Sequence, residues 1–344
     1  FFPEQGVNDP CIDYVVRGPA EDVILDVIEG RVNDKVVMGH IPDINALPFP
    51  DRTILYKYDE FGKARMKRFI TSRDCHHRCK FCYNSLFHKL WQDEKYMFHQ
   101  RILPDKLIEE IERVRTDYGL ELVYFNDDDL AGSRKWLTEF CEKFKSKVGL
   151  SFCGSIRASS VDYDLLKVMA DAGCTFLLVG LQSANEKTLK LIGRTVTSEQ
   201  VRRVCEWCDD LGIKVRVENM IGLPTEDPLG DALETLEFNM GLKLADSWAA
   251  IFQPFPKTEL WQYCVDRGLI NRDTNCVRFY DNTVLAIDNA EKINRLHKWW
   301  YFVMKHRMPM ELVDILLEIP LDEKQSSALW NLRWKMTARE VYGL

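Results

Sequence analysis

Between about residue 67 and residue 265, short apolar runs alternate with longer stretches that have the spacing of amphipathic helices. The apolar runs are rich in β-branched and aromatic residues, which favours buried strands. Strands alternating with helices in this way are typical of a parallel sheet with helices outside it. We predict strands at residues 68–71, 122–125, 150–156, 176–180, 215–221 and 248–253.

The stretches between these strands place their apolar side chains on one helical face. Residues 104–118, for example, begin with Pro104 and carry Leu107 and Ile111 on the same face. Strand-then-helix units joined by right-handed crossovers wind into a barrel or most of one. The predicted fold class is therefore α/β, with a partial (β/α)6 TIM-like barrel over residues 67–265.

The C-terminal part, residues 266–344, is predicted to be a helical extension that caps the barrel and contacts part of the substrate. Its longest helical pattern, at residues 287–306, contains the run Trp299, Trp300 and Tyr301. Bulky aromatic side chains mainly supply buried area. We therefore interpret this run as core rather than as a binding site.

The first 66 residues have weaker patterns. Residues 11–18 predict a short strand, and residues 20–30 predict an amphipathic helix with acidic residues in its first turn. One strand and one helix bury too little surface to form a core by themselves. Residues 31–66 contain several prolines and little periodicity, so we predict a linker that lies on the barrel.

Composition narrows the class of protein. A hydrophobic share of 46% with 29% charged residues is that of an ordinary globular protein, and the net charge of -7 argues against a general nucleic-acid binder. No run of about 18 apolar residues predicts a membrane span. The cysteines do not have the short, loop-rich setting of a secreted disulfide scaffold, so we expect a reducing cytoplasm.

Three cysteines follow the first predicted strand at the spacing Cys75-x3-Cys79-x2-Cys82. Three soft ligands on one loop can face one metal centre and leave a coordination position open for a reacting molecule. One alternative is a zinc loop in which a nearby histidine is the fourth ligand; another is three unrelated buried cysteines. The candidate histidines are His76, His77 and His88.

Other cysteines fit a structural role better. Cys205 and Cys208 share a helical face with Val201 and Val204, so we interpret them as core. Cys264 and Cys276 have no clustered set of ligands around them. We therefore expect a single metal centre.

Polar residues directly follow several predicted strands, and active sites of parallel barrels lie at these strand ends. Asn126, Asp127 and Asp128 follow the second strand, where their oxygens can accept hydrogen bonds from an ammonium group. Arg157 follows the third strand, and its planar fork suits a carboxylate. Alone, these acids also fit a solvated loop, and Arg157 fits a surface ion pair.

The cysteine spacing, with aromatic Phe81 directly before the third cysteine, resembles the signature of the radical S-adenosylmethionine (SAM) superfamily. That resemblance implies a [4Fe-4S] cluster held by Cys75, Cys79 and Cys82, with SAM on the fourth iron. It also implies a barrel of the radical SAM type. The segments after the other five strands are similar to the family's SAM-binding segments. The resemblance assigns cofactor binding to Phe81, Asn126, Asp127, Asp128, Arg157, Gln182, Ser183, Arg194, Gly222 and Leu223.

Some positions depart from the family pattern. Leu130 replaces the usual aromatic residue, and Gln182 replaces Glu while keeping its hydrogen-bonding capacity. Lys257 stands where the family has Gly in a Pro-x-Pro-Gly-Thr turn, which puts the local turn geometry in question.

The N-terminal segment resembles the end of the cobalamin-binding domain that precedes the barrel in one large subgroup. The match rests on Phe2-Pro3-Glu4 and on residues 15–21. It implies that residues 1–30 are a remnant of a Rossmann-like cobalamin domain. The sequence contains no Asp-x-His-x-x-Gly motif. Whether cobalamin is a third cofactor beside the cluster and SAM is therefore left open by the sequence.

The resemblance implies reductive cleavage of SAM and radical chemistry on a small-molecule or peptide substrate, with an electron donor such as flavodoxin or ferredoxin. Cobalamin-linked C-methylation is the leading hypothesis. A cyclase or rearrangement enzyme without cobalamin is the alternative within the family. A non-catalytic, zinc-stabilised binding module is the alternative from another class, and metal analysis distinguishes it from the enzyme.

Overall fold

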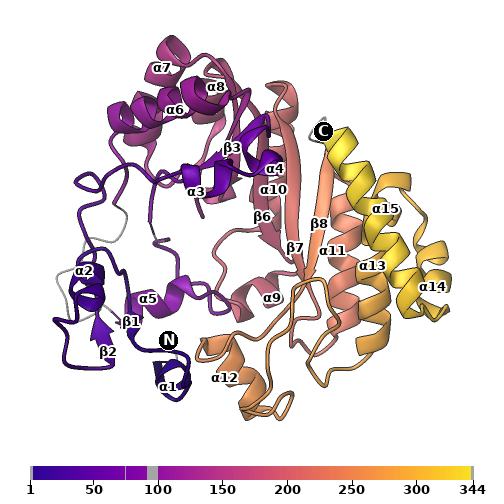
Figure 1. Cartoon of the computed structure of the whole chain (residues 1–344). Coiled ribbons are helices and arrows are strands. Elements are labelled where there is room, and N and C mark those ends of the chain that lie inside the picture. Colours follow the sequence, from indigo (N-terminus) through magenta and orange to yellow (C-terminus); the bar gives the residue numbers. More distant parts are fainter. Residues whose placement is uncertain (1–2, 74, 91–99, 342–344) are drawn as a thin grey trace.

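The computed structural model describes residues 3–73, 75–90 and 100–341. Its centre is one sheet of parallel strands in the order β3-β4-β5-β6-β7-β8, each paired with the next strand in the chain (Figure 1). Within the described residues β3 and β8 do not pair, so the sheet does not close on itself. It forms a partial barrel, as predicted. The strands are β3 (Met66–Phe69), β4 (Leu122–Phe125), β5 (Ser151–Ile156), β6 (Cys174–Gln182), β7 (Lys214–Ile221) and β8 (Asp246–Ile251).

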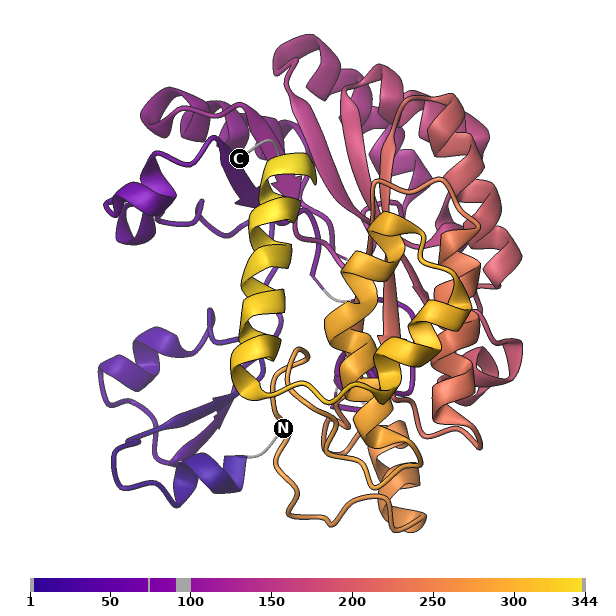
Figure 2. The ribbon, with the colours of Figure 1, turned by 90° about the vertical axis from the view of Figure 1, so that its right-hand side faces the viewer.

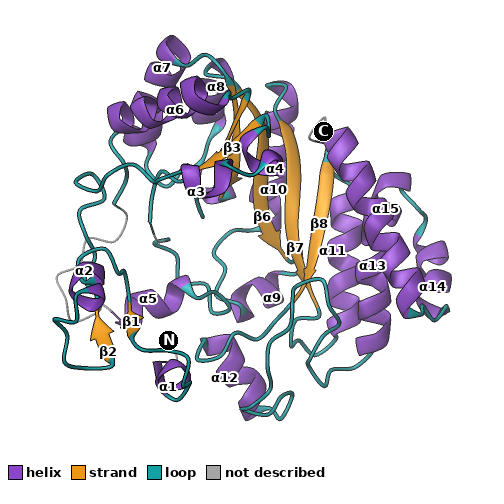
Figure 3. Cartoon of the chain, viewed as in Figure 1, coloured by secondary structure: helices purple, strands orange, loops and turns teal. Residues whose placement is uncertain are grey.

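Helices cover the outer face of this sheet, and their apolar sides form the largest core (Figure 3). Leu107 and Ile111, predicted to lie on one face, are fully buried there, and so are Cys205 and Cys208, which confirms their structural role. The helices that connect the strands are α5 (Asn84–Leu90), α6 (Pro104–Tyr118), α7 (Arg134–Lys147), η1 (Ala158–Ser160), α8 (Tyr163–Asp171), α9 (Glu186–Leu191), α10 (Ser198–Asp210) and α11 (Pro228–Met240).

Helix starts follow local chemistry. Ser133, Asp162 and Thr197 each accept a hydrogen bond from a backbone N–H in the first turn of the helix that follows. Such caps satisfy backbone donors that have no partner inside the helix. They fix where each helix begins and therefore how long each strand-end loop is.

The N-terminal region contains a small parallel pair, β1 (Val15–Arg17) and β2 (Val36–Met38), with the short helices α1 (Pro3–Val7) and α2 (Ile24–Ile28). The expected strand and helix are both present but shorter than the predicted ranges. Figure 1 places this region below β3 and apart from the sheet.

The stretch expected as a linker contains β2 and two further short helices, α3 (Thr53–Tyr56) and α4 (Asp59–Gly62). Side chains fasten it to the barrel: Asn45 Nδ2 donates to the Arg101 carbonyl, and Lys106 Nζ donates to the Asn45 carbonyl at 2.8 Å. Arg52 donates to Glu110 of α6 at 2.6 Å. This stretch therefore forms a wall against the β3 edge.

The C-terminal part is helical, as expected. Trp300 of α13 is fully buried, and its indole N–H donates to Ser247 of β8 at 3.0 Å, which confirms it as core. Figure 2 shows α15 running along the open side of the barrel, where Trp330 and Trp334 contact Trp248. The helices are α12 (Glu259–Asp266), α13 (Ala290–His306), α14 (Met310–Glu318) and α15 (Glu323–Val341).

Candidate functional site

The cysteine loop follows β3 and is held in place by a carboxylate from the next strand. Asp127, buried at the end of β4, accepts hydrogen bonds from the Thr71 N–H and hydroxyl and from the Ser72 hydroxyl. These bonds tie the start of the loop to the neighbouring strand end. Asp127 therefore supports the start of the cysteine loop, and it also lines the large cavity described below.

Two arginines converge on the middle cysteine of the loop. Arg157, after β5, donates from Nη1 to the Cys79 sulfur at 3.8 Å, and Arg194, after α9, does the same at 3.8 Å. Cys79 and Arg157 are both buried. Two guanidinium groups beside one sulfur stabilise negative charge on it, which suits a thiolate ligand.

A hydrogen bond to the backbone of Gly180 holds the Arg194 side chain in this position. Its Nη2 donates to the Gly180 carbonyl. A Cβ on Gly180 would lie 2.6 Å from Arg194 Nη2 and 3.0 Å from Gln182 Nε2. Only glycine leaves that room. Gln182 itself has φ 80° and interrupts the register between β6 and β7.

The three consecutive acids after β4 have different surroundings. Asp128 is exposed and accepts a hydrogen bond from Asn84 Nδ2 at 2.9 Å. Desolvation in the loop, together with the neighbouring carboxylates Asp127 and Asp129, raises the pKa of Asp128. Asn126 is also exposed. Of the residues predicted to bind the cofactor, Asn126 and Asp128 are the exposed ones at the mouth of the barrel.

Asp129 is the functional candidate that the sequence did not single out. It is buried and accepts hydrogen bonds from the Ser160 hydroxyl at 2.6 Å and from the Arg157 N–H at 3.2 Å, and His77 lies 3.7 Å away. Burial favours a higher pKa, but the nearby His77 and the hydrogen bonds from the Ser160 hydroxyl and the Arg157 N–H lower the pKa of Asp129. It therefore links the cysteine loop to the end of β5.

The remaining predicted residues pack against the core or lie within it, or have a special backbone conformation. Phe81 packs against a buried apolar cluster that contains Leu223. Gly222 has φ 73°, a conformation that favours glycine. Ser183 is fully buried and donates to Asp231 at 2.8 Å, so its hydroxyl faces the core behind the strand end.

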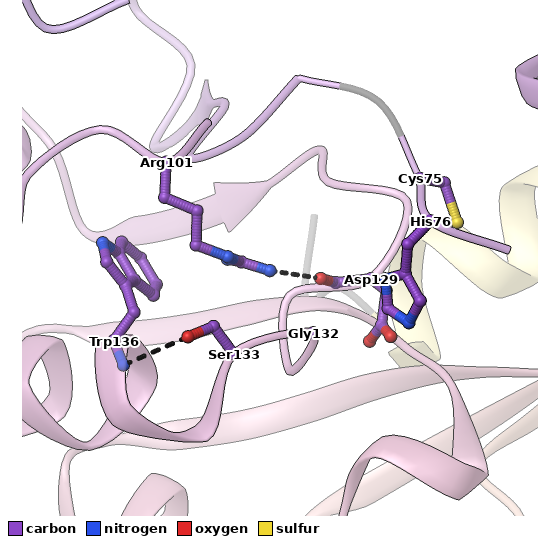
Figure 4. A pocket seen from close by; sticks show the side chains of 7 residues that line it. All are labelled: Cys75, His76, Arg101, Asp129, Gly132, Ser133 and Trp136. Carbon is purple, nitrogen blue, oxygen red and sulfur yellow. Dashed lines mark hydrogen bonds between the residues drawn. The ribbon is translucent and has the colours of Figure 1, made fainter. Parts of the chain in front are cut away.

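A small cavity of about 180 Å³ borders the cysteine loop (Figure 4). Arg101 crosses it, donating to the Asp129 carbonyl at 2.8 Å and stacking on Trp136. Cys75 and His76 face it from the other side. This cavity therefore lies on the side of the cysteine loop that faces Asp129.

The donor set fits an iron–sulfur cluster better than one metal ion. Within the part of the chain that the structure describes, no three His, Cys, Asp or Glu side chains are gathered around a single ion position. Cluster cysteines each bind a different iron and so stand further apart than ligands of a single ion. His88, a candidate zinc ligand, bonds to the Cys75 carbonyl instead, at 2.9 Å. Burial raises the pKa of the Cys75 thiol to about 11, so a metal must displace its proton.

A much larger cavity, of about 1380 Å³, opens between the N-terminal region and the β3 edge. Its walls include Asn126 and Asp128 at the mouth of the barrel, Arg68 and Ile70 at the edge strand, and the stretch around Phe49. The cavity therefore reaches the same strand ends as the predicted cofactor residues.

The backbone conformation of Lys257 accounts for its place in a turn where the family pattern has glycine. It adopts φ 69°, the left-handed conformation that glycine takes most easily. The turn therefore keeps the backbone form expected of a glycine, with a lysine in its place.

Comparison with known proteins agrees with this site. Residues 69–238 match the sequence model of the Radical SAM superfamily. The chain is 26% identical over 298 residues to an uncharacterized methyltransferase of Pyrococcus horikoshii, covering 78% of this chain and 62% of that protein. It is 25% identical over 300 residues to the anaerobic magnesium-protoporphyrin IX monomethyl ester cyclase of Rubrivivax gelatinosus, covering 77% and 51%. The chain thus spans between half and two thirds of the length of these relatives.

Among solved structures, the cobalamin-dependent S-adenosylmethionine radical enzyme OxsB with aqua-cobalamin bound aligns with a TM-score of 0.62 at 15% identity. The alignment covers 93% of this chain and 54% of that one. At this identity the likeness concerns the fold, and it confirms the barrel type. Among the described residues, no helix has the length and apolarity that crossing a bilayer requires.

Proposed function

Because the chain belongs to the radical SAM superfamily through a domain at residues 69–238, we propose that it is an enzyme that cleaves SAM reductively at a [4Fe-4S] cluster and starts radical chemistry on a substrate. Cys75, Cys79 and Cys82 hold the cluster. When bound, the cluster supplies the electron that splits SAM into methionine and a 5′-deoxyadenosyl radical, which abstracts a substrate hydrogen.

The observation that carries this proposal is the pair of guanidinium groups on Cys79. A buried cysteine with Arg157 and Arg194 each 3.8 Å from its sulfur is suited to a charged ligand role and poorly suited to apolar packing. Arg157 comes from the loop after β5, and Arg194 from the loop between α9 and α10 of the same barrel. Their convergence follows from the fold rather than from proximity in the sequence.

The chain's own residues bind and orient SAM in this proposal. Asn126 and Asp128 accept hydrogen bonds from its ammonium group, since both face the mouth of the barrel. Arg157 binds its carboxylate while keeping contact with Cys79. Gln182 borders the ribose side, and Ser183 contributes to it through its backbone, because its hydroxyl is bonded to Asp231. Phe81, Gly222 and Leu223 lie along the adenine.

Cysteine substitution tests the cluster assignment. We expect Cys79→Ala, reconstituted without oxygen, to lose the broad absorption near ~400 nm and most of its iron and acid-labile sulfide. Cys11→Ala is the matched control, because Cys11 is exposed and far from the loop in sequence. Retention of about three to four irons per chain in Cys79→Ala, or zinc without sulfide in the parent protein, would refute the assignment.

The net reaction belongs to the proposal as well. We infer C-methylation with cobalamin as the leading activity, and ring formation or rearrangement without cobalamin as the second candidate. A flavodoxin or ferredoxin in the cytoplasm supplies the electron. We further propose that residues 1–30 correspond to the last part of a cobalamin-binding domain, residues 31–66 to a linker and residues 266–344 to a cap.

Two measurements separate these activities. Anaerobic purification with hydroxocobalamin followed by cobalt analysis should give about one cobalt per chain for the methylation hypothesis. Cobalt far below that ratio restricts the enzyme to chemistry without cobalamin. A search for products labelled from deuterated SAM then identifies the substrate.

A further inference from the structure

The large cavity beside β3 has walls whose charged groups are mostly satisfied within the protein. Arg52 pairs with Glu110 at 2.6 Å, and Arg73 pairs with Glu21. The Lys67 ammonium donates to the carbonyls of residues 61, 62 and 64. These charges hold the walls together and offer little to a ligand.

The apolar part of the lining is extensive. It includes Ile41 and Phe49 on the N-terminal side, Ile70 on the edge strand, Phe87 of α5 and Ile102 before α6. Ile70, directly after β3, is 52% exposed and adds to this apolar surface. A cavity of about 1380 Å³ with such walls suits a ligand with a large apolar body.

Arg68 differs from the other cations of the cavity. It comes from the edge strand β3, lines the cavity, and is exposed. Its guanidinium lies 5.1 Å from the centre of the Tyr124 ring, and among the described residues it makes no ion pair. Arg17, on the facing wall, likewise has no ion pair there. Arg68 and Arg17 therefore carry positive charge without an ion pair, and the carboxylates of the lining that make no ion pair among the described residues are Asp51, Asp127 and Asp128.

We propose that this cavity is the substrate site and that it takes a large, mostly apolar molecule with an anionic group bound by Arg68. The inference rests on the proposed function, because Asn126 and Asp128 line the same cavity and would place the apolar body next to bound SAM. An anion at Arg68 would fix one end of the substrate. The other end would then present its C–H bond to the cofactor.

Dye binding tests the charge requirement without knowledge of the substrate. The probes are 8-anilinonaphthalene-1-sulfonate and its uncharged relative N-phenyl-1-naphthylamine, titrated by calorimetry into the reconstituted full chain. We expect Arg68→Gln to weaken binding of the sulfonate about tenfold and to leave the neutral dye unchanged. Arg65→Gln is the control, because Arg65 lies in the same segment, pairs with Glu121 and does not line the cavity.

A second pair of variants tests the apolar wall. Ile70→Glu should abolish binding of both dyes, whereas Ile315→Glu, at a similarly exposed position on α14, should leave both unchanged. Equal sulfonate affinity in Arg68→Gln and the parent protein would overturn the proposal, as would displacement of both dyes by hydroxocobalamin, which would assign the cavity to a corrinoid. If Cys79→Ala keeps its irons while the dyes bind to the cavity as expected, only the proposed function is wrong.

Discussion

At the scale of single residues, the informative contact is that of two cations with one cysteine sulfur. Arg157 and Arg194 both donate to Cys79, and burial lowers the pKa of Arg194. Hydrogen bonds and positive charge near cluster sulfurs raise the reduction potential, because they stabilise the added electron. The arrangement thus favours reduction of the centre that the cysteines are proposed to hold.

Removing one of these cations should make the cluster harder to reduce. We expect Arg194→Gln to shift the potential to a more negative value by about 60 mV, which corresponds to the loss of roughly one charge-assisted hydrogen bond. An anaerobic redox titration followed by electron paramagnetic resonance measures the shift. Arg203→Gln, on the solvent side of α10, should leave the potential unchanged, and an unchanged potential in Arg194→Gln would contradict the assigned role.

The sequence could place the cysteine loop and most of the polar residues at strand ends, because local spacing determines these positions. It could not tell which of Asp127, Asp128 and Asp129 is turned inward, since this depends on contacts with Thr71, Ser160 and other distant residues. Ser183 illustrates the same limit. Its hydroxyl partner, Asp231, lies 48 positions away in the chain.

At the scale of elements, Asp127 joins the end of β4 to the loop after β3. We expect Asp127→Ala to lower the free energy of unfolding by about 3 kcal/mol, because buried donors of Thr71 lose their acceptor. Urea denaturation of the reconstituted protein measures the change. Asp128→Ala, which removes an exposed carboxylate from the same loop, should cost less than about 1 kcal/mol; equal effects of the two substitutions would count against this role.

A second prediction at this scale concerns the packing of α13 between β8 and α15. Burial, together with the positive charges of Lys298 and Arg333, lowers the pKa of His297 to about 3. The unfolded chain therefore binds more protons between pH 6.5 and pH 3, so the free energy of unfolding falls as the pH drops through that range. The slope from this group is up to about 1.4 kcal/mol per pH unit.

Replacement of this histidine should reduce the acid sensitivity. His297→Gln is expected to have a smaller loss of unfolding free energy between pH 6.5 and pH 4.5 than the parent protein, measured by urea denaturation at each pH. His306→Gln provides the comparison, because His306 lies exposed near the end of the same helix. Parallel pH profiles for His297→Gln and the parent protein would contradict the prediction.

Elements with clear periodicity were predictable, whereas several of the short ones were not. The strand predicted at 122–125 is β4 with the same ends, and the predicted helix at 104–118 is α6. By contrast, α3 and α4 have four residues each, too few to produce a periodic pattern. Contacts such as that between Arg52 and Glu110 position them, and those contacts join residues 58 positions apart.

At the scale of the whole molecule, the cysteine loop and the large cavity both adjoin the same edge strand. The cysteine loop begins directly after β3, and the cavity wraps around Met66, Arg68 and Ile70 of that edge. Both sites therefore depend on the position of one four-residue strand. The N-terminal stretch supplies the outer wall, which the sequence predicted only as a linker lying on the barrel.

The unpaired edges of β3 and β8 have a consequence for how such an enzyme can diversify. A closed barrel has a circumference set by its strand number and stagger, so a wider lumen requires a different sheet. Among the described residues β3 and β8 do not pair, and Figure 2 shows α15 running along the gap between them. Changes in the length or tilt of α15 can therefore alter the size of molecule admitted, while the strand ends around Cys79 keep their register.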